Sequence, residues 1–174
     1  QDVDGLTGNE VNEHPAGKPH RPQLLSETVF DPDPHHDWKN VEEQLRDDNG
    51  GFVRNFAANK KKPKHPERVM HYHNAAQLRA FDHLAKEFCV CDRWFSSVPG
   101  ATQPNRMYSL AGHCNGRKEI LSLVQLPGGW DVRPIFEFLP KDVSWRFYSH
   151  DIASLRFVKG YQGKVEEIDK IDAF

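Results

Sequence analysis

The stretch that decides the fold is FCVCDRWFSSVPGATQPNRMYSLAG, residues 88–112. Its first part, residues 88–95, is apolar and aromatic apart from two adjacent charges, which is typical of a strand buried in a sheet core. The turn residues at 96–100 end this run, and Thr102 then precedes a helical pattern that stops at Gly112. We therefore expect a buried strand, a turn and a helix whose N-cap is Thr102.

The expected position of Thr102 has a chemical consequence. An N-cap hydroxyl lies beside unpaired backbone N–H groups and the positive end of the helix dipole, where anions bind. A phosphate held there is open to attack by the hydroxyl if a metal ion or a base removes its proton. The alternative is a purely structural cap, since most threonine caps take no part in chemistry.

Two consecutive motifs, CDRWFSSVPG at 91–100 and TQPNR at 102–106, resemble the signature of a known family. It is the bacterial phosphoesterase family that includes non-haemolytic phospholipase C and an acid phosphatase, and it is similar in fold to alkaline phosphatase. The resemblance implies that Thr102 is the nucleophile and a metal ligand, and that Asn105 and Arg106 bind phosphate. The alternative for both is an ordinary first-turn role, with Arg106 paired to a surface carboxylate.

Two upstream segments extend the resemblance. DVDGLTGNEVN at 2–12 resembles the segment that follows a metal-binding Glu-Asn motif in the family, and DPHHDW at 33–38 resembles its Asp-Pro-x-His-x-Trp element. The second match implies a catalytic role for His36, which would hydrogen-bond a phosphate oxygen or orient the nucleophile. The resemblance also implies a divalent metal ion of open identity, bound by Thr102 and by further ligands outside this chain.

Composition limits the classes of protein that remain. Hydrophobic residues make up 37% and the mean hydropathy is −0.74, which is polar for a complete domain. The formal charge of −2 argues against a nucleic-acid-binding face, and no apolar run approaches the roughly 20 residues of a membrane span. We expect a truncated portion of one catalytic domain. Export from the cell is suggested by the family resemblance alone.

The expected architecture is α/β, a partial alkaline-phosphatase-like fold with a parallel-type sheet flanked by helices. Residues 1–36 are expected to be irregular, residues 37–112 to hold helices, the core strand and the nucleophile helix, and residues 113–174 to form a second helix–strand unit. Within these parts the patterns predict helices from Asp37 to 49–51, across 51–56, from Asn74 to 88, from Asp131 to 139 and near 168–174. They also predict a strand at 143–148, and either a strand or a lid edge at 120–126.

Cysteines and basic residues suggest little further chemistry. Cys89, Cys91 and Cys114 are expected to be buried free thiols, with a disulfide from Cys114 as the alternative. A zinc or redox protein is the least favoured class. The lysine-rich run 59–66 predicts a solvated loop, and the alternative is contact with an anionic head group.

The predicted function is hydrolysis of phosphate esters, of the phospholipase C type, in which Thr102 cleaves a phosphodiester through a phosphothreonine intermediate. The expected partner is a phospholipid or another phosphate ester. An acid phosphatase is the alternative within the class. The alternative from another class is a non-catalytic fragment or a phosphoanion-binding module, because Thr102 would be the one expected metal ligand in this chain and a catalytic metal takes about three protein ligands.

Overall fold

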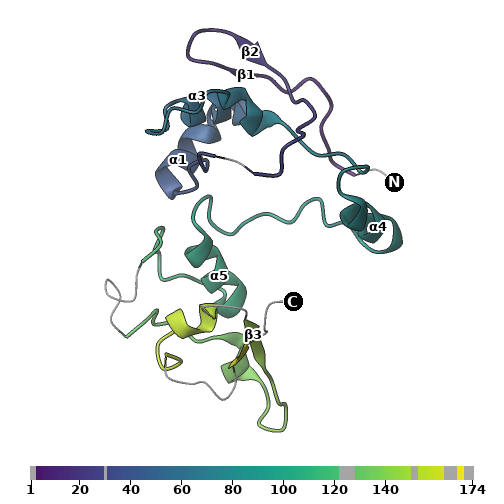
Figure 1. The fold of residues 1–174 in the computed structure, drawn as a ribbon. Coiled ribbons are helices and arrows are strands. Elements are labelled where there is room, and N and C mark those ends of the chain that lie inside the picture. The colour runs from purple at the N-terminus through teal and green to yellow at the C-terminus, as the bar shows by residue number, and fades with distance from the viewer. Residues whose placement is uncertain (1–2, 30, 122–127, 150–152, 163–167, 171–174) are drawn as a thin grey trace. The chain divides into compact units, whose positions relative to one another are not determined.

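The computed structural model of the chain describes residues 3–29, 31–121, 128–149, 153–162 and 168–170 (Figure 1). The chain divides into two compact units, Gln1–Ser96 and Ser97–Phe174. The first unit contains β1 (Asn12–Glu13), β2 (Pro19–His20), α1 (Trp38–Gln44), α2 (Arg46–Asn49), α3 (Phe52–Ala57), the 3₁₀ helix η1 (Pro66–Met70) and α4 (Arg79–Glu87). The second contains α5 (Thr102–Ala111), the 3₁₀ helix η2 (Ile135–Phe138), β3 (Phe147–Ser149), the 3₁₀ helix η3 (Ser154–Phe157) and β4 (Ile168–Lys170).

The core of the first unit forms where α1, α3 and the β1–β2 hairpin meet. Val53 and Phe56 of α3 are fully buried. The side chain of Asn12 joins the hairpin to this helix, because its Oδ1 accepts a hydrogen bond from the Val53 N–H at 3.2 Å and its Nδ2 donates to the Asn49 carbonyl at 3.0 Å. Figure 1 shows the hairpin lying beside α3.

Local signals set the start of α1 and the start of α3 as predicted. The Asp37 carboxylate accepts a hydrogen bond from the Asn40 N–H at 3.2 Å and caps α1. Gly51 separates the helices because a Cβ at this position would overlap the backbone of Glu43. The short helix expected after Gly51 is therefore confirmed as α3. The helix expected from Asp37 to residues 49–51 is confirmed only over α1, because α1 ends at Gln44 and α2 has a left-handed backbone at Asp47 and Asp48, with φ +55° and +56°.

The predicted core strand at 88–95 is wrong. These residues have no strand pairing, and the side chains of Trp94 and Phe95 are 86% and 80% exposed. The segment is linked to the N-terminal region by polar contacts, since Arg93 Nε donates to Asp4 Oδ2 at 2.7 Å and Asp92 Oδ2 accepts from the Asp4 N–H at 2.8 Å. A strand forms when neighbouring strands satisfy its backbone, and the described part of this unit places none beside residues 88–95.

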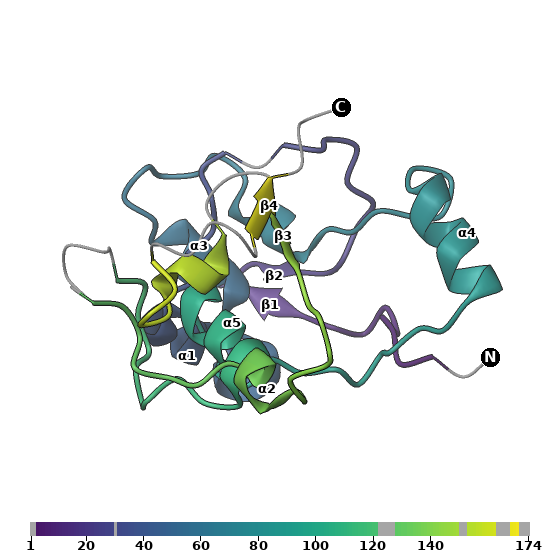
Figure 2. The same cartoon turned by 90° about the horizontal axis from the view of Figure 1, so that it is seen from below.

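Helix α4 is confirmed over residues 79–87 but begins later than predicted. Asn74 caps the turn before it, where its Oδ1 accepts from the Gln77 N–H at 3.2 Å and the Gln77 Oε1 accepts from the Asn74 N–H at 2.9 Å. The apolar side of α4 is exposed, with Phe81 at 71% and Leu84 at 52%. Figure 2 shows α4 set apart from α1 and α3 of the same unit.

The second unit is organised around α5 and a buried tryptophan. Met107 of α5 is fully buried, and the helix ends at Gly112, which has φ +75° and donates its N–H to the Tyr108 carbonyl at 2.8 Å. Trp130 is also fully buried. Its N–H donates to the carbonyl of Phe157, the last residue of η3, at 2.6 Å, and its carbonyl accepts from the Lys159 N–H at 2.8 Å. Helix α5 contacts η3.

Several predictions for the second unit are corrected. The helix expected over 131–139 is reduced to η2, with Ile135 and Phe138 exposed, because Pro134 lacks the N–H that a continuous helix requires and Pro140 bars its extension. The strand expected at 143–148 is confirmed only from 147, as β3. The helix expected near 168–174 is wrong at 168–170, which form β4, and 171–174 lie outside the described residues. The strand expected at 120–126 lies mostly outside them.

The two strand pairs are short and local. β1 and β2 are antiparallel, and β3 and β4 are parallel in register from Phe147 opposite Ile168 to Ser149 opposite Lys170. The chain therefore has the mixed α/β content that was predicted. The larger parallel sheet does not occur among the residues that the structure describes.

The three cysteines differ in burial. All are free thiols, and Cys114 is buried, with its Sγ 3.1 Å from the Arg117 carbonyl. Cys89 and Cys91 are exposed, so the prediction of buried thiols is confirmed for Cys114 and wrong for the other two. The reason is that residues 88–95 lack the covering layer that a core strand would have.

Candidate functional site

Thr102 is the first residue of α5 and not its N-cap. The capping position belongs to Ala101, whose backbone is extended with φ −65° and ψ 160°. The predicted cap is therefore wrong by one residue. The Thr102 side chain is exposed, and its hydroxyl has no hydrogen-bond partner within the described residues. It lies in the first turn, where backbone N–H groups lack helical partners and the helix dipole favours an anion.

Asn105 holds the turn that leads into α5. Its Oδ1 accepts from the Val98 N–H at 3.0 Å, and its Nδ2 donates to the Val98 and Ala101 carbonyls, both at 3.0 Å, with the Gly100 carbonyl at 3.4 Å. Val98 and Ala101 are buried, so these backbone groups rely on the amide. Asn105 thus places Thr102 at the start of the helix, and a direct contact with phosphate would require its Nδ2 to give up one of these bonds.

Arg106 connects α5 to η3. Its Nη1 donates to the Ser154 Oγ at 2.8 Å, and the partner is thus a hydroxyl and not the surface carboxylate of the alternative interpretation. A guanidinium group has five N–H donors, so this hydrogen bond leaves most of them available. Arg106 follows Thr102 by four positions, so the two residues lie on the same side of α5.

Gln103 is a positioning residue that the sequence reasoning missed. Its Oε1 accepts from the Leu121 N–H at 2.7 Å, and its Nε2 donates to the Leu121 carbonyl at 3.1 Å. This reciprocal pair attaches a distant segment to the first turn of α5. The only signal in the sequence was its position next to Thr102 within the TQPNR motif.

His36 lies in the first unit, immediately before α1. Its ring is exposed, and Nδ1 is 3.2 Å from the Pro34 carbonyl and 3.5 Å from the Asp33 carboxylate. The next residue is the α1 cap, Asp37. Partial burial raises the pKa of Asp37, but hydrogen bonds from Asn40 outweigh that effect and hold the pKa below the usual aspartate range. The local structure thus keeps a carboxylate beside His36.

The described residues do not fit a complete metal centre. Across these ranges, no group of three or more His, Cys, Asp or Glu side chains is placed to hold a metal ion. Among the predicted site residues, Thr102, Asn105 and Arg106 share the first turns of α5, whereas His36 belongs to the other unit. The divalent ion stays a prediction.

The helices among the described residues are four to ten residues long. Over the described ranges, none is both long enough and apolar enough to cross a bilayer.

A helix whose first residue is an exposed threonine, with a clamped turn before it and an arginine after it, is an arrangement suited to binding phosphate esters. Comparison with known proteins leads to the same class, because residues 1–172 match the Phosphoesterase family. The chain belongs to the phosphoesterase family. The predicted family membership is thereby confirmed.

The similar proteins are plant enzymes, so the comparisons do not support the bacterial restriction of the prediction. The chain is 34% identical over 157 residues to non-specific phospholipase C3 of Arabidopsis thaliana, covering 79% of this chain and 29% of that protein. It is 32% identical over 173 residues to non-specific phospholipase C1, covering 91% and 31%, and 29% identical over 163 residues to non-specific phospholipase C6, covering 90% and 31%. The chain therefore spans less than a third of the length of these curated relatives.

Proposed function

We propose that this chain belongs to a phosphoesterase that cleaves phosphodiesters in the manner of a phospholipase C, with Thr102 as the nucleophile. The observation that carries the proposal is the family match over residues 1–172, which includes the TQPNR motif at the start of α5. The names of the relatives favour a phosphodiester over a monoester as substrate.

In the proposed reaction, Thr102 Oγ1 forms a bond to phosphorus as the ester P–O bond breaks. The hydroxyl loses its proton during the attack, and the leaving alcohol oxygen gains one. Water then attacks the phosphothreonine, releases the phosphorylated head group and restores the hydroxyl. Negative charge on the phosphoryl oxygens would be stabilised by the first-turn N–H groups of α5 and by Arg106.

His36 and Asn105 have separate proposed roles. For His36 we propose a hydrogen bond to a phosphate oxygen or to the nucleophile, a role that rests on the match of residues 33–38 to the family element. For Asn105, we propose that it supports phosphate binding by holding the turn before Thr102. Direct phosphate contact by its amide is the role that the resemblance implies, and the hydrogen bonds to Val98 and Ala101 compete with that contact.

The test is hydrolysis by the full-length protein of two chromogenic substrates, p-nitrophenyl phosphorylcholine and p-nitrophenyl phosphate. We expect Thr102→Ala to lower kcat for the diester on the order of a thousandfold or more, as loss of a nucleophile does. Ser109→Ala removes a second exposed hydroxyl from the same helix and is the matched control, with activity expected within about twofold of the parent.

Three outcomes distinguish the readings. Activity that survives in Thr102→Ala would overturn the assignment of the nucleophile. Turnover of the monoester alone would favour the acid phosphatase. A protein that binds phosphate esters in a Thr102-dependent manner but turns over neither substrate would favour the phosphoanion-binding module.

A further inference from the structure

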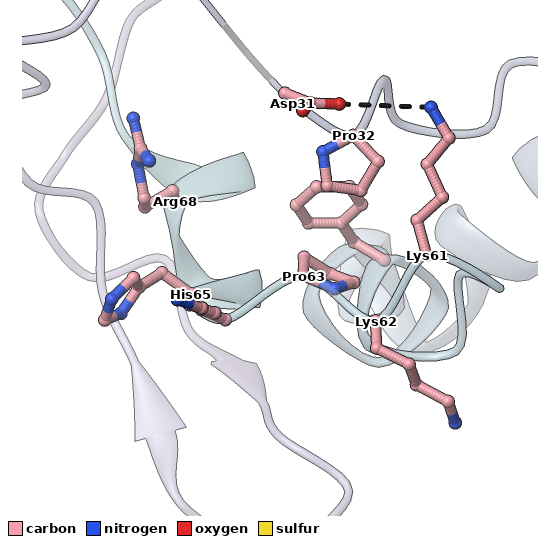
Figure 3. Close-up of a pocket in the computed structure, with 9 residues that line it drawn as sticks. Asp31, Pro32, Lys61, Lys62, Pro63, His65 and Arg68 are labelled. Atoms are coloured by element: carbon pink, nitrogen blue, oxygen red, sulfur yellow. Dashed lines mark ion pairs between the residues drawn. The ribbon is translucent and has the colours of Figure 1, made fainter.

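The first unit contains a cavity of about 440 Å³ lined mainly by basic side chains (Figure 3). Its walls come from the segment at Asp31 and Pro32, from the loop at residues 61–65 and from η1, which contributes Arg68. In Figure 3, Lys61 points towards Asp31, and His65 and Arg68 lie on the other side of Pro32 and Pro63. None of these residues belongs to the proposed Thr102 site.

The walls of the cavity are held by one buried amide. Asn59 is 6% exposed, and its Nδ2 donates to the Asp33 carbonyl at 3.2 Å while its Oδ1 accepts from the Lys61 N–H at 3.0 Å. The Asn59 carbonyl accepts from the Lys62 N–H at 2.9 Å, and Lys62 adopts φ +51°. The lysine loop and the segment at Asp33 are therefore joined by direct hydrogen bonds.

The charges around the cavity are unequal. Residues 59–66 carry four lysines and no acidic residue. Lys61 Nζ is 3.9 Å from Asp31 Oδ1, and both side chains are mostly exposed, so this ion pair is weak and open to exchange with another anion. Lys64 forms no ion pair with another of the residues that the structure describes. Lys62 points away from Asp31 in Figure 3 and adds charge at longer range.

On the η1 side of the cavity, both basic side chains have a carboxylate partner. Arg68 Nη2 is 3.2 Å from Glu27 Oε2, and His65 Nδ1 is 3.2 Å from Glu67 Oε1. The lysine side keeps its excess of positive charge. The lining also includes the carbon surfaces of Pro32 and Pro63, which favour a ligand that combines an anion with an apolar part.

We infer that this cavity binds an organic phosphate ester, with the phosphate between Lys61 and Lys64 and the carbon portion against Pro32 and Pro63. The volume falls within the roughly 300–1,000 Å³ of small-molecule sites. Ammonium groups form charge-assisted hydrogen bonds with phosphate, and a dianionic phosphate competes well with the single, distant carboxylate of Asp31. The same chemistry is presented by a soluble phosphate ester and by the head group of an anionic phospholipid.

The experiment measures binding in full-length protein carrying Thr102→Ala, so that turnover plays no part and failure of the proposed function does not affect the result. The probes are glycerol 3-phosphate in solution, followed by calorimetry, and vesicles of phosphatidylcholine with phosphatidic acid, followed by co-sedimentation. The cavity variant is Lys61→Gln with Lys64→Gln. The matched control, Lys18→Gln with Lys39→Gln, removes the same charge from two exposed lysines outside the cavity.

We expect the cavity variant to weaken binding about tenfold or more, and the control to stay within about twofold, because only the first removes charge-assisted contacts. Binding of both probes would identify soluble esters as sufficient ligands, and binding of vesicles alone would identify the lipid head group. Absence of binding to both probes would overturn the inference, as would an equal loss in the two variants. Unfolding curves of both variants confirm that each is folded.

Discussion

Helices α4 and α5 are similar in length and differ in what they bury. None of the nine residues of α4 is buried, although Phe81 and Leu84 give it a distinct apolar side. Helix α5 is less amphipathic in sequence, yet it buries Pro104 and Met107 and contacts η3. The pattern of apolar residues therefore predicted that both segments are helical, but not which of them is anchored in a core.

The two helices also begin differently. The turn before α4 is closed by Asn74 and Gln77, which are exposed and bond to each other. The turn before α5 is closed by Asn105, whose amide serves the buried backbone at Val98 and Ala101. Water replaces the exposed bonds before α4 more readily than the partly buried bonds before α5, so the residue that orients Thr102 should contribute more to stability.

The largest expected effect comes from the buried side of α5. Met107→Ala should lower the free energy of unfolding by about 2–5 kcal/mol, because it removes a fully buried side chain and leaves a cavity. Leu84→Ala on α4 should change it by less than about 0.5 kcal/mol, since that side chain is 52% exposed. Urea denaturation measures both, and equal losses would remove the distinction between the helices.

The turn before α5 gives the next effect. Asn105→Ala should cost about 1–3 kcal/mol, because it leaves buried N–H and C=O groups without partners. Amide hydrogen exchange at Val98 should accelerate by the corresponding factor. The control is Asn74→Ala, in which the lost hydrogen bonds are exposed. The contrast would fail if Asn74→Ala lost as much stability as Asn105→Ala and if exchange at Val98 were equally fast in the two variants.

The end of α5 should show a purely conformational cost. Gly112 has φ +75°, and a Cβ placed there meets no atom within 4 Å. Gly112→Ala should therefore lower stability by about 1 kcal/mol through the left-handed backbone alone, and Gly112→Asn by less. Thermal unfolding of the two variants checks the order, and a stabilising alanine would contradict the αL assignment.

The smallest effect is on the exposed surface of α4. Lys86 Nζ lies 2.7 Å from Asp82 Oδ2, one turn away on the same helix. Lys86→Gln should lower stability by about 0.3–0.5 kcal/mol at low salt, with the difference lost near 1 M salt through screening. A larger, salt-independent loss would show that α4 depends on this pair for more than surface electrostatics.

Two predictions that rested on local chemistry succeeded. Asp37 caps α1 and Gly112 ends α5 because a cap or a left-handed glycine acts on the backbone within a few residues. The strand at 88–95 failed because its formation depends on partners distant in the sequence. For the site, the TQPNR motif located the start of the helix at Thr102 and the turn before it to within one residue. The hydrogen bonds of Asn105 and Gln103 could not be predicted, because they depend on how the turn and Leu121 pack against α5 and not on the spacing of residues in the sequence.

By itself the sequence determined the family and several of the helical segments, and it supplied the residues that we propose for phosphoester chemistry, because these depend on residue identity and short-range spacing. The tertiary structure alone decided that Ala101 caps α5, that Asn105 secures the turn before Thr102, that the apolar side of α4 is exposed and that Asn59 joins the walls of a basic cavity. The physical reason is that burial and hydrogen bonding between distant backbone segments are properties of the folded chain. Local propensity favours individual helices and turns, but it does not decide how they pack together.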